Sequence, residues 1–153
     1  MERFFRDLFD RFQELHNDME RVLQELPQEA LDWVPGGDTN SLGVLAVHTA
    51  GSQRFWVGDV VAGEPSARDR DAEFHVRGLD AAQLVERLQR SLRFSRGVLE
   101  ELSLEDLSAV RVSPINQREI TVGWALAHAL EHTALHLGHM QLTRQMWEQQ
   151  AQG

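Results

Sequence analysis

The sequence contains no cysteine at any of its 153 positions. A disulfide and a thiolate metal site are therefore both excluded, and no covalent chemistry can start from a thiol of the protein. If sulfur takes part in a reaction, a ligand must supply it. A chain of this length buries about two-thirds of the surface that it exposes when unfolded, which is enough for one hydrophobic core without disulfides. We therefore expect one domain over residues 1–153.

The sequence also lacks a long uninterrupted run of apolar residues at its start. The first residues, MERFFRDLFDRF, mix charged and apolar side chains. A signal peptide needs an unbroken apolar core of about 7–15 residues, and a membrane-spanning helix needs about 20. We therefore expect a cytoplasmic protein that does not insert into a membrane.

Basic residues are scarce relative to acidic ones. The chain has 15 Lys and Arg against 24 Asp and Glu, which gives a formal net charge of -9. Such a charge repels the phosphate backbone of a nucleic acid unless a strong basic patch overrides it, and the sequence shows no such patch. The densest charged run, ARDRDAE at residues 67–73, is nearly balanced and indicates a solvated loop. We expect no nucleic-acid partner.

The first helix is predicted from an apolar stripe with i, i+4, i+7 spacing that begins at Phe5. It should end near Leu26, because Pro27 follows. The stripe includes His16, and a lone histidine on an apolar face is read most simply as a core residue. The segment DWVPGGDTN, residues 32–40, then predicts a turn-rich connection, since it contains Pro and paired Gly.

The second helix is predicted over residues 42–62, with Asn40 or Ser41 as its N-cap and the sequence GEP ending it. Residues 65–78 are polar and aperiodic, so they predict a long link rather than a helix. A link of that length allows the next helix to pack either parallel or antiparallel to this one.

Two further helices follow the link. Asp80 predicts the start of the third, whose apolar residues recur at helical spacing as far as Leu102. A second long connection, about residues 105–120, contains a proline and leads to Thr121, the predicted cap of a final helix over residues 122–149. Four amphipathic helices joined by two long links predict an all-α four-helix bundle.

The final helix carries four histidines on one face. At about 100° per residue they fall within an arc of roughly 80°, flanked by apolar side chains. They therefore point inward, and burying unpaired imidazoles costs about 1–3 kcal/mol for each polar group left without a partner. A bound metal ion would remove that cost. The four residues are His128, His132, His136 and His139.

Two histidines at i and i+4 can reach one metal ion, because their Cβ atoms lie about 5–6 Å apart. A third ligand must then come from another helix, and His48 is the candidate, since it lies on the apolar side of the second helix. Three histidines leave one or two positions for water or substrate, which is typical of catalytic sites. Spacing alone does not decide whether His132 pairs with His128 or with His136.

A competing interpretation comes from the segment His128-Ala-Leu-Glu131-His132, which matches the H-x-x-E-H pattern of one class of zinc proteases. That pattern needs the glutamate at the metal. The helical wheel instead places Glu131 about 80–100° from the centre of the histidine arc. We therefore do not favour a protease.

Two segments resemble the DinB-like (DinB/YfiT-like) family of metalloenzymes: SLGVLAVHTAGSQRFW, residues 41–56, and VGWALAHALEHTALHLGHM, residues 122–140. The first carries a histidine followed by small residues and a Trp. The second carries two histidines separated by three residues, followed closely by Gly. By this resemblance the metal ligands are His48, His132 and His136.

The resemblance further implies an up-down-down-up bundle, often a homodimer, that binds Zn²⁺, Ni²⁺ or a similar divalent ion. Its characterised members are thiol-dependent transferases and isomerases that use low-molecular-weight thiols. Two departures concern the surroundings of the ligands, since many relatives have an acid at the position of Gln53 and a glutamine at the position of His139. His128 and His139 are candidates for residues that hydrogen-bond to the ligands or transfer protons. The sequence identifies no catalytic residue and no organic cofactor.

The sequence is compatible with three functions for the metal site. Metal-assisted transfer or isomerisation with a small thiol is the first hypothesis, because a metal can hold a thiol as a thiolate and so supply the nucleophile that a cysteine-free chain lacks. Metal-assisted hydrolysis is the second, with water in the open position. The third is a non-enzymatic stress or interaction protein whose metal stabilises the bundle.

Overall fold

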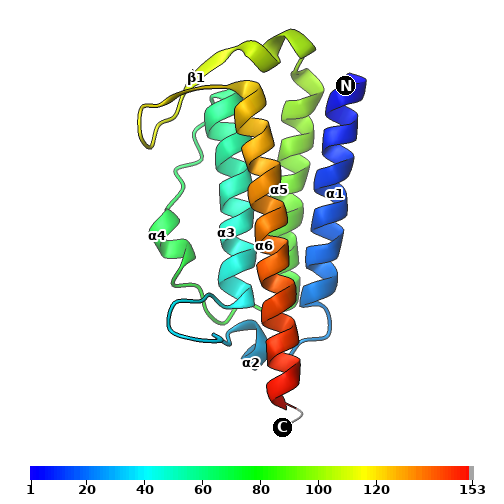
Figure 1. Ribbon diagram of the computed structural model, residues 1–153, viewed down its shortest axis with the longest axis vertical. Helices are drawn as coiled ribbons and strands as arrows, with labels where there is room; N and C mark the ends of the chain where they lie inside the picture. The colour runs from blue at the N-terminus through cyan, green and yellow to red at the C-terminus, as the bar shows by residue number, and fades with distance from the viewer. Residues whose placement is uncertain (152–153) are drawn as a thin grey trace.

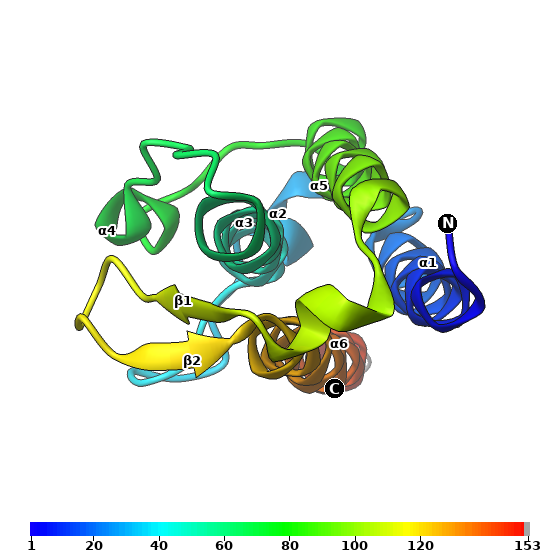
Figure 2. The same cartoon turned by 90° about the horizontal axis from the view of Figure 1, so that it is seen from above.

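Four long helices dominate the computed structural model, which describes the backbone of residues 1–151 and the side chains of residues 1–150 (Figure 1). They are α1 (Arg3–Leu23), α3 (Leu42–Arg54), α5 (Ala81–Glu101) and α6 (Val122–Ala151). Seen along the bundle, they form a ring in the order α1, α5, α3, α6 (Figure 2). The helices α1 and α6 run in one direction and α3 and α5 in the other, so the up-down-down-up topology is confirmed.

The helix ends follow the predicted caps. Ser41 is the N-cap of α3 and accepts a hydrogen bond from the backbone of Val44 at 3.2 Å. Asp80 caps α5, and the Thr121 hydroxyl accepts a hydrogen bond at the start of α6. These bonds satisfy backbone N–H groups that have no partner inside the helix. The first helix ends at Leu23, slightly earlier than predicted.

The predicted second helix is not one α-helix. After α3 the chain continues as the π-helix η1 (Phe55–Ala62). The wider turn brings residues five apart together, and the Arg54 guanidinium donates to the carboxylate of Asp59 at 3.1 Å. A Cβ atom at Gly58 would overlap that guanidinium, so the missing side chain makes room for it. Apolar periodicity does not distinguish the two windings, which is why the sequence predicted one helix.

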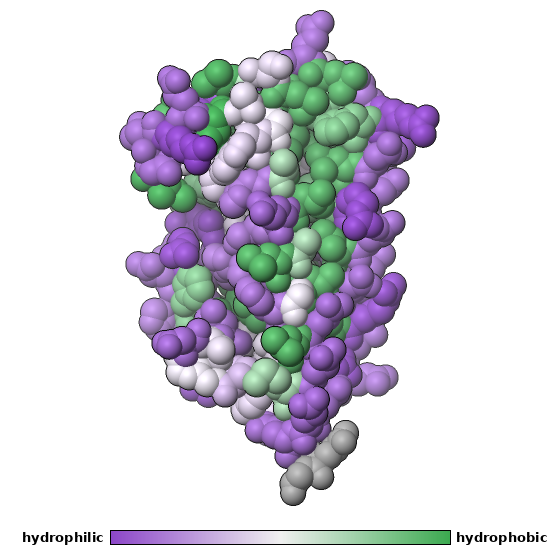
Figure 3. All heavy atoms as spheres, in the orientation of Figure 1, coloured by the Kyte–Doolittle hydropathy of each residue, from purple (hydrophilic) through white to green (hydrophobic). Residues whose placement is uncertain are grey.

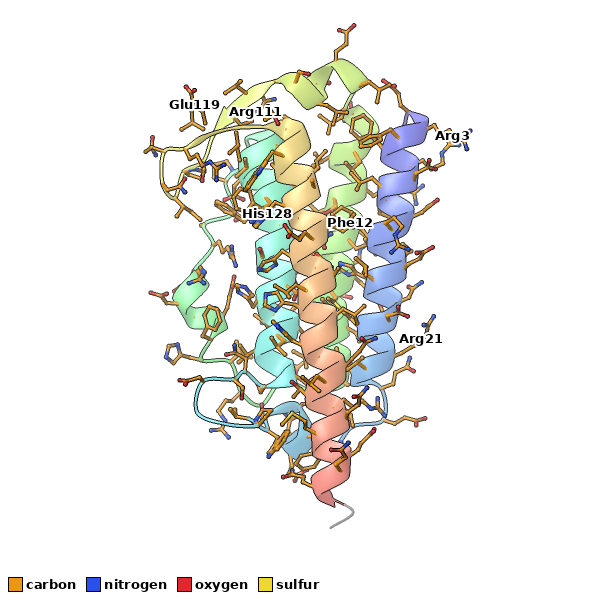
Figure 4. The ribbon with its side chains drawn as sticks, viewed as in Figure 1. Arg3, Phe12, Arg21, Arg111, Glu119 and His128 are labelled. Carbon is orange, nitrogen blue, oxygen red and sulfur yellow. The ribbon has the colours of Figure 1, made fainter. Side chains whose placement is uncertain are left out.

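The connections contain short elements that the sequence analysis missed. A single helical turn, α2 (Gln28–Leu31), precedes α3, and another, α4 (Arg70–Glu73), lies in the link to α5. The 3₁₀-helix η2 (Leu104–Ser108) leads to an antiparallel hairpin of β1 (Val110–Val112) and β2 (Glu119–Thr121), in which Arg111 faces Ile120. Strands of three residues are too short to show alternation in a sequence. Arg111, labelled with Glu119 in Figure 4, donates to the backbone of Val61 and so anchors the hairpin to η1.

Apolar side chains fill the space between the four helices, and Phe12 is among those with no exposed surface (Figure 4). Apolar side chains are also exposed along α6, the helix at the front of Figure 3. These are Trp124, Leu135, Leu142 and Met146. Within the described residues, no helix combines the length and the apolar character that crossing a lipid bilayer requires.

His16 lies in the core, with 0% of its surface exposed, as predicted for a lone histidine on an apolar face. Its Nε2 donates a hydrogen bond to Oε1 of Gln53 at 2.7 Å, and the amide of Gln53 donates to the hydroxyl of Ser95 at 2.9 Å. This chain of bonds joins α1, α3 and α5. Burial lowers the pKa of His16, and the hydrogen bond with Gln53 offsets only part of that effect. The imidazole is therefore neutral in the native protein.

We predict that His16 makes the protein less stable in acid. As the pH falls below the ordinary pKa of 6.5, the unfolded chain binds a proton at His16 that the native state does not bind, so the free energy of unfolding decreases. The contribution reaches at most about 1.4 kcal/mol per pH unit. His16→Gln keeps a donor for Gln53 but cannot titrate, so its urea unfolding, measured with EDTA from pH 7.5 to 5, should show a weaker dependence on pH.

The exposed His75 provides the matched control, since His75→Gln also removes one imidazole. This variant should unfold with the pH dependence of the wild type. An identical pH dependence in wild type and His16→Gln would show that burial of His16 does not oppose its protonation.

Candidate metal centre

Three histidine rings meet between α3 and α6. His48 projects from α3, and His132 and His136 project from successive turns of α6. The Nε2 atom of His132 lies 3.2 Å from Nε2 of His48 and 3.1 Å from Nε2 of His136. The three candidate ligand atoms all lie within 4.8 Å of one another. The structure therefore brings together the three histidines that the sequence analysis selected.

A carboxylate fixes the orientation of His48. Glu73, from α4, accepts a hydrogen bond from Nδ1 of His48 at 2.9 Å. Arg68 binds the same carboxylate through two nitrogens, at 2.6 and 2.8 Å. The Glu73 residue is only 6% exposed. Burial alone raises the pKa of its carboxyl, but the hydrogen bonds from Arg68 and His48 outweigh burial and hold the pKa below its ordinary value.

The ionised state of Glu73 decides which nitrogen of His48 carries the proton. A carboxylate only accepts hydrogen bonds, so Nδ1 of His48 must be the donor. In a neutral ring, Nε2 then has a free lone pair, and this atom faces His132. An outer carboxylate that orients a histidine in this way is a common feature of metal sites.

Gly51 makes the approach of Glu73 possible. It lies one turn after His48 on α3, and a Cβ atom at this position would overlap Oε1 of Glu73 and lie 2.9 Å from its Cδ. Any side chain here would push the carboxylate away from the helix. The contact between His48 and Glu73 therefore depends on the absence of a side chain at residue 51.

His132 and His136, the two histidines that α6 contributes to the cluster, are uncharged at neutral pH. Burial, followed by repulsion from His136, His48, His128 and Arg68, lowers the pKa of His132 to about 3. Burial, followed by repulsion from His48 and His139, lowers the pKa of His136 to about 4. Neutral imidazoles have lone pairs to offer a metal ion, whereas imidazolium ions have none.

The geometry fits a divalent metal ion. Three nitrogens bound at 2.0–2.1 Å to one tetrahedral ion lie about 3.3 Å apart. The two contacts to His132 are 3.2 and 3.1 Å, and all three nitrogens lie within 4.8 Å of one another. Without an ion, a proton on Nε2 of His132 could satisfy only one of these two contacts, because a neutral imidazole has a single N–H group. The cluster can therefore hold one metal ion, with its fourth position free of protein ligands.

Comparison with known proteins identifies the family of this chain and agrees with its fold. The sequence profile described as the DinB superfamily matches residues 11–140. The chain belongs to the DinB superfamily. Among curated proteins, none matches the chain.

Three solved structures resemble this protein closely in fold. A conserved protein from Enterococcus faecalis is 16% identical, with a TM-score of 0.80 over 95% of this chain and 98% of that one. A DinB-like protein from Bacillus cereus is 13% identical, with a TM-score of 0.74 over 92% and 91%. YfiT from Bacillus subtilis is 15% identical, with a TM-score of 0.76 over 97% and 90%, and is described as a probable metal-dependent hydrolase with an unusual four-helix bundle topology.

The other two histidines of α6 lie beside the trio of this DinB protein, one on each side. His139 is exposed, and its Nδ1 lies 3.4 Å from Nδ1 of His136. The ring of His128, labelled in Figure 4, stacks on Trp124 of the same helix at 5.0 Å and meets the edge of Trp56 in η1 at 4.7 Å. Glu131 is outside the cluster, since its side chain is 80% exposed. The structure thus lacks the glutamate at the metal that the protease interpretation requires.

Two expectations about the surroundings of the DinB ligands were wrong. Residues 67–73 are not merely a solvated loop, because Arg68 and Glu73 are drawn inward to His48. Gln53 belongs to the core network of His16 rather than to the cluster. The one residue of the sequence that could have predicted α4 was Asp69. Its carboxylate caps this helix by accepting a hydrogen bond from the backbone N–H of Ala72 at 3.0 Å. A cap locates a helix start, but it does not show what the helix contacts.

We predict that Gly51→Ala weakens metal binding about 10–100-fold, which is the usual effect of disturbing a group behind a metal ligand. The methyl group would displace Glu73 and release the ring of His48. Affinity for Co²⁺ can be measured by its absorption spectrum, in competition with a chelator. Gly97→Ala in α5 is the matched control, since a Cβ there meets no atom within 4 Å. Equal Co²⁺ affinity in wild type and Gly51→Ala would contradict a role for Glu73 in orienting His48.

Proposed function

We propose that the protein binds one divalent metal ion through His48, His132 and His136 and is a metal-dependent enzyme that acts on a small molecule as a homodimer. The observation that carries the proposal is the convergence of three Nε2 atoms, one of them fixed by a buried carboxylate. The homodimer follows from the family resemblance alone. Imidazole ligands suit both Zn²⁺ and Ni²⁺, and we propose one of these two ions.

The surroundings support catalysis better than a purely structural ion. Structural zinc sites use four protein ligands, whereas three ligands leave a position for water or substrate. His132 and His136 are only partly buried, so the cluster is reachable from solvent. The ring of His128 lies 6.0 Å from that of His132, and Trp56 packs against His128, so the two offer polar and apolar surface to a small molecule.

We favour thiol-dependent transfer or isomerisation as the reaction. A metal ion with an open position holds a small thiol as a thiolate at neutral pH and so supplies a nucleophile. The chain has no cysteine of its own, and membership of the DinB superfamily supports this chemistry through the resemblance described above. In this proposal His48, His132 and His136 hold the ion, Glu73 orients His48, and His139 is placed to exchange protons with solvent.

Hydrolysis is the second candidate, and the likeness to YfiT favours it. That protein is described as a probable metal-dependent hydrolase, and it shares the bundle topology. Here the open position would hold water with a pKa near 7. The same three histidines serve both reactions, so the protein ligands do not distinguish them.

We predict that His48→Ala and His136→Ala each reduce metal affinity by more than about 100-fold, since even the loss of a group behind a ligand costs 10–100-fold. His128→Ala is the matched control, because it removes an imidazole one turn from His132 without removing a proposed ligand. Metal content after dialysis, measured by mass spectrometry, checks the prediction. Retained metal in the first two variants with loss in the third would overturn the ligand assignment.

We predict that small thiols change the visible spectrum of the Co²⁺-substituted protein by adding a sulfur-to-cobalt charge-transfer band, whereas the corresponding alcohols do not. Turnover of a panel of ester and amide substrates tests the second candidate in parallel. A spectrum that thiols leave unchanged, together with hydrolysis of a panel substrate, would favour hydrolysis over thiol chemistry.

A further inference from the structure

A cavity of about 810 Å³ lies between α3, α5 and the connection that carries α4. Each of the two helices lines it with residues at i, i+3, i+4 and i+7, starting from Val47 in α3 and from Arg87 in α5. Such spacing places four residues of a helix on one face. The connection closes the third side with residues between Pro65 and Val76.

The charged residues of this cavity are mainly basic, although the whole chain carries a net charge of -9. Four arginines line it, against two acidic residues. Both acids already have partners in the protein. The carboxylate of Asp69 accepts a hydrogen bond from the backbone of α4, and Glu73 is held by Arg68 and His48. They are therefore poorly placed to neutralise the other basic groups.

The four arginines divide into two pairs. Arg54 lies over the ring of Phe94 at 3.8 Å and donates to Asp59 and to a backbone carbonyl, so it serves the local structure. Arg68 uses one edge of its guanidinium for Glu73. Among the described side chains, Arg87 and Arg90 form no ion pair with an acidic residue. These two, one turn apart on α5, have their charge free for a ligand.

We propose that this cavity binds a small organic anion, with its carboxylate, sulfonate or phosphate at Arg87 and Arg90 and its apolar body on Val47, Ala50 and Phe94. A guanidinium donates two parallel hydrogen bonds to such an oxyanion, and the volume lies in the range of about 300–1,000 Å³ that is usual for small-molecule sites. The mixture of a basic rim and an apolar floor selects an amphipathic anion over an inorganic ion or a neutral molecule.

This site is separate from the proposed metal centre but shares a wall with it. Arg68 and Glu73 line the cavity, and both also lie beside His48, with Nη2 of Arg68 at 3.5 Å from its Nδ1. An anion in the cavity therefore lies behind the metal ligands and does not occupy the open position of the metal.

The test uses 8-anilinonaphthalene-1-sulfonate, a fluorescent probe with an apolar body and one sulfonate, and N-phenyl-1-naphthylamine, which has the same body without the charge. Fluorescence titrations should show saturable binding of the sulfonate by the wild type. In the Arg87→Gln/Arg90→Gln variant its dissociation constant should rise at least about tenfold, since charge-assisted hydrogen bonds are lost. Binding of the neutral probe should be weaker and equal in both proteins.

Arg93→Gln/Arg96→Gln is the matched control, because these arginines lie on the same helix, pair with Glu86 and Glu100 and do not line the cavity. It makes the same change in net charge and should leave the affinity for the sulfonate unchanged. If both double variants bound the sulfonate equally weakly, the loss of affinity would come from the change in overall charge. If the two probes bound equally well, binding would come from apolar contact alone. Either result, or the absence of saturable binding, would overturn the proposal.

The outcome is independent of the proposed metal-dependent function. Arg87 and Arg90 are not ligands, so their double variant should retain the metal content of the wild type. If neither the wild type nor any variant binds metal, while binding of the sulfonate still depends on Arg87 and Arg90, the proposal of a metal site fails and the proposal of an anion site is retained.

Discussion

The hydrogen bond between His48 and Glu73 joins the bundle to the long connection that runs beside it. It requires a helix without a side chain at residue 51, a carboxylate kept ionised by Arg68, and a histidine that gives its Nδ1 proton to that carboxylate. Together these conditions leave Nε2 of His48 facing the histidines of α6. The rest of the centre follows from this bond, because α6 supplies the neutral imidazoles of His132 and His136 at the matching height of the bundle.

The topology explains why a connection is available for this role. Since α3 and α5 run parallel, the chain must return along the whole bundle between them, and α4 lies on that return path (Figure 1). An antiparallel pair could be joined by a short turn, which would reach neither His48 nor the face of α5. The same path thus supplies the outer carboxylate of the centre and one wall of the arginine-lined cavity.

Charge is distributed unevenly over this acidic protein. Several exposed arginines form ion pairs with nearby glutamates or aspartates, such as Arg96 with Glu100, and pairs of that kind stabilise a protein little. Inside, burial keeps the imidazoles of His16, His132 and His136 neutral. The buried pair of Arg68 and Glu73 is the exception, and it lies where the connection meets α3. The buried ion pair of Arg68 and Glu73 thus lies where it fixes the orientation of His48, a proposed metal ligand.

The sequence by itself determined the four helices, their caps at Ser41, Asp80 and Thr121, and the inward face of the histidines on α6. These features depend on residues within one or two turns of each other, so local periodicity and capping reveal them. Only the tertiary structure decided that Glu73 meets His48 and that Gly51 admits it. The family resemblance had already selected His136 over His128, but only the tertiary structure brings His136 and His132 together beside His48. Those contacts depend on how α6 is rotated against α3 and on the path of a polar connection. Both are set by packing between distant segments, and neither leaves a periodic trace in the sequence.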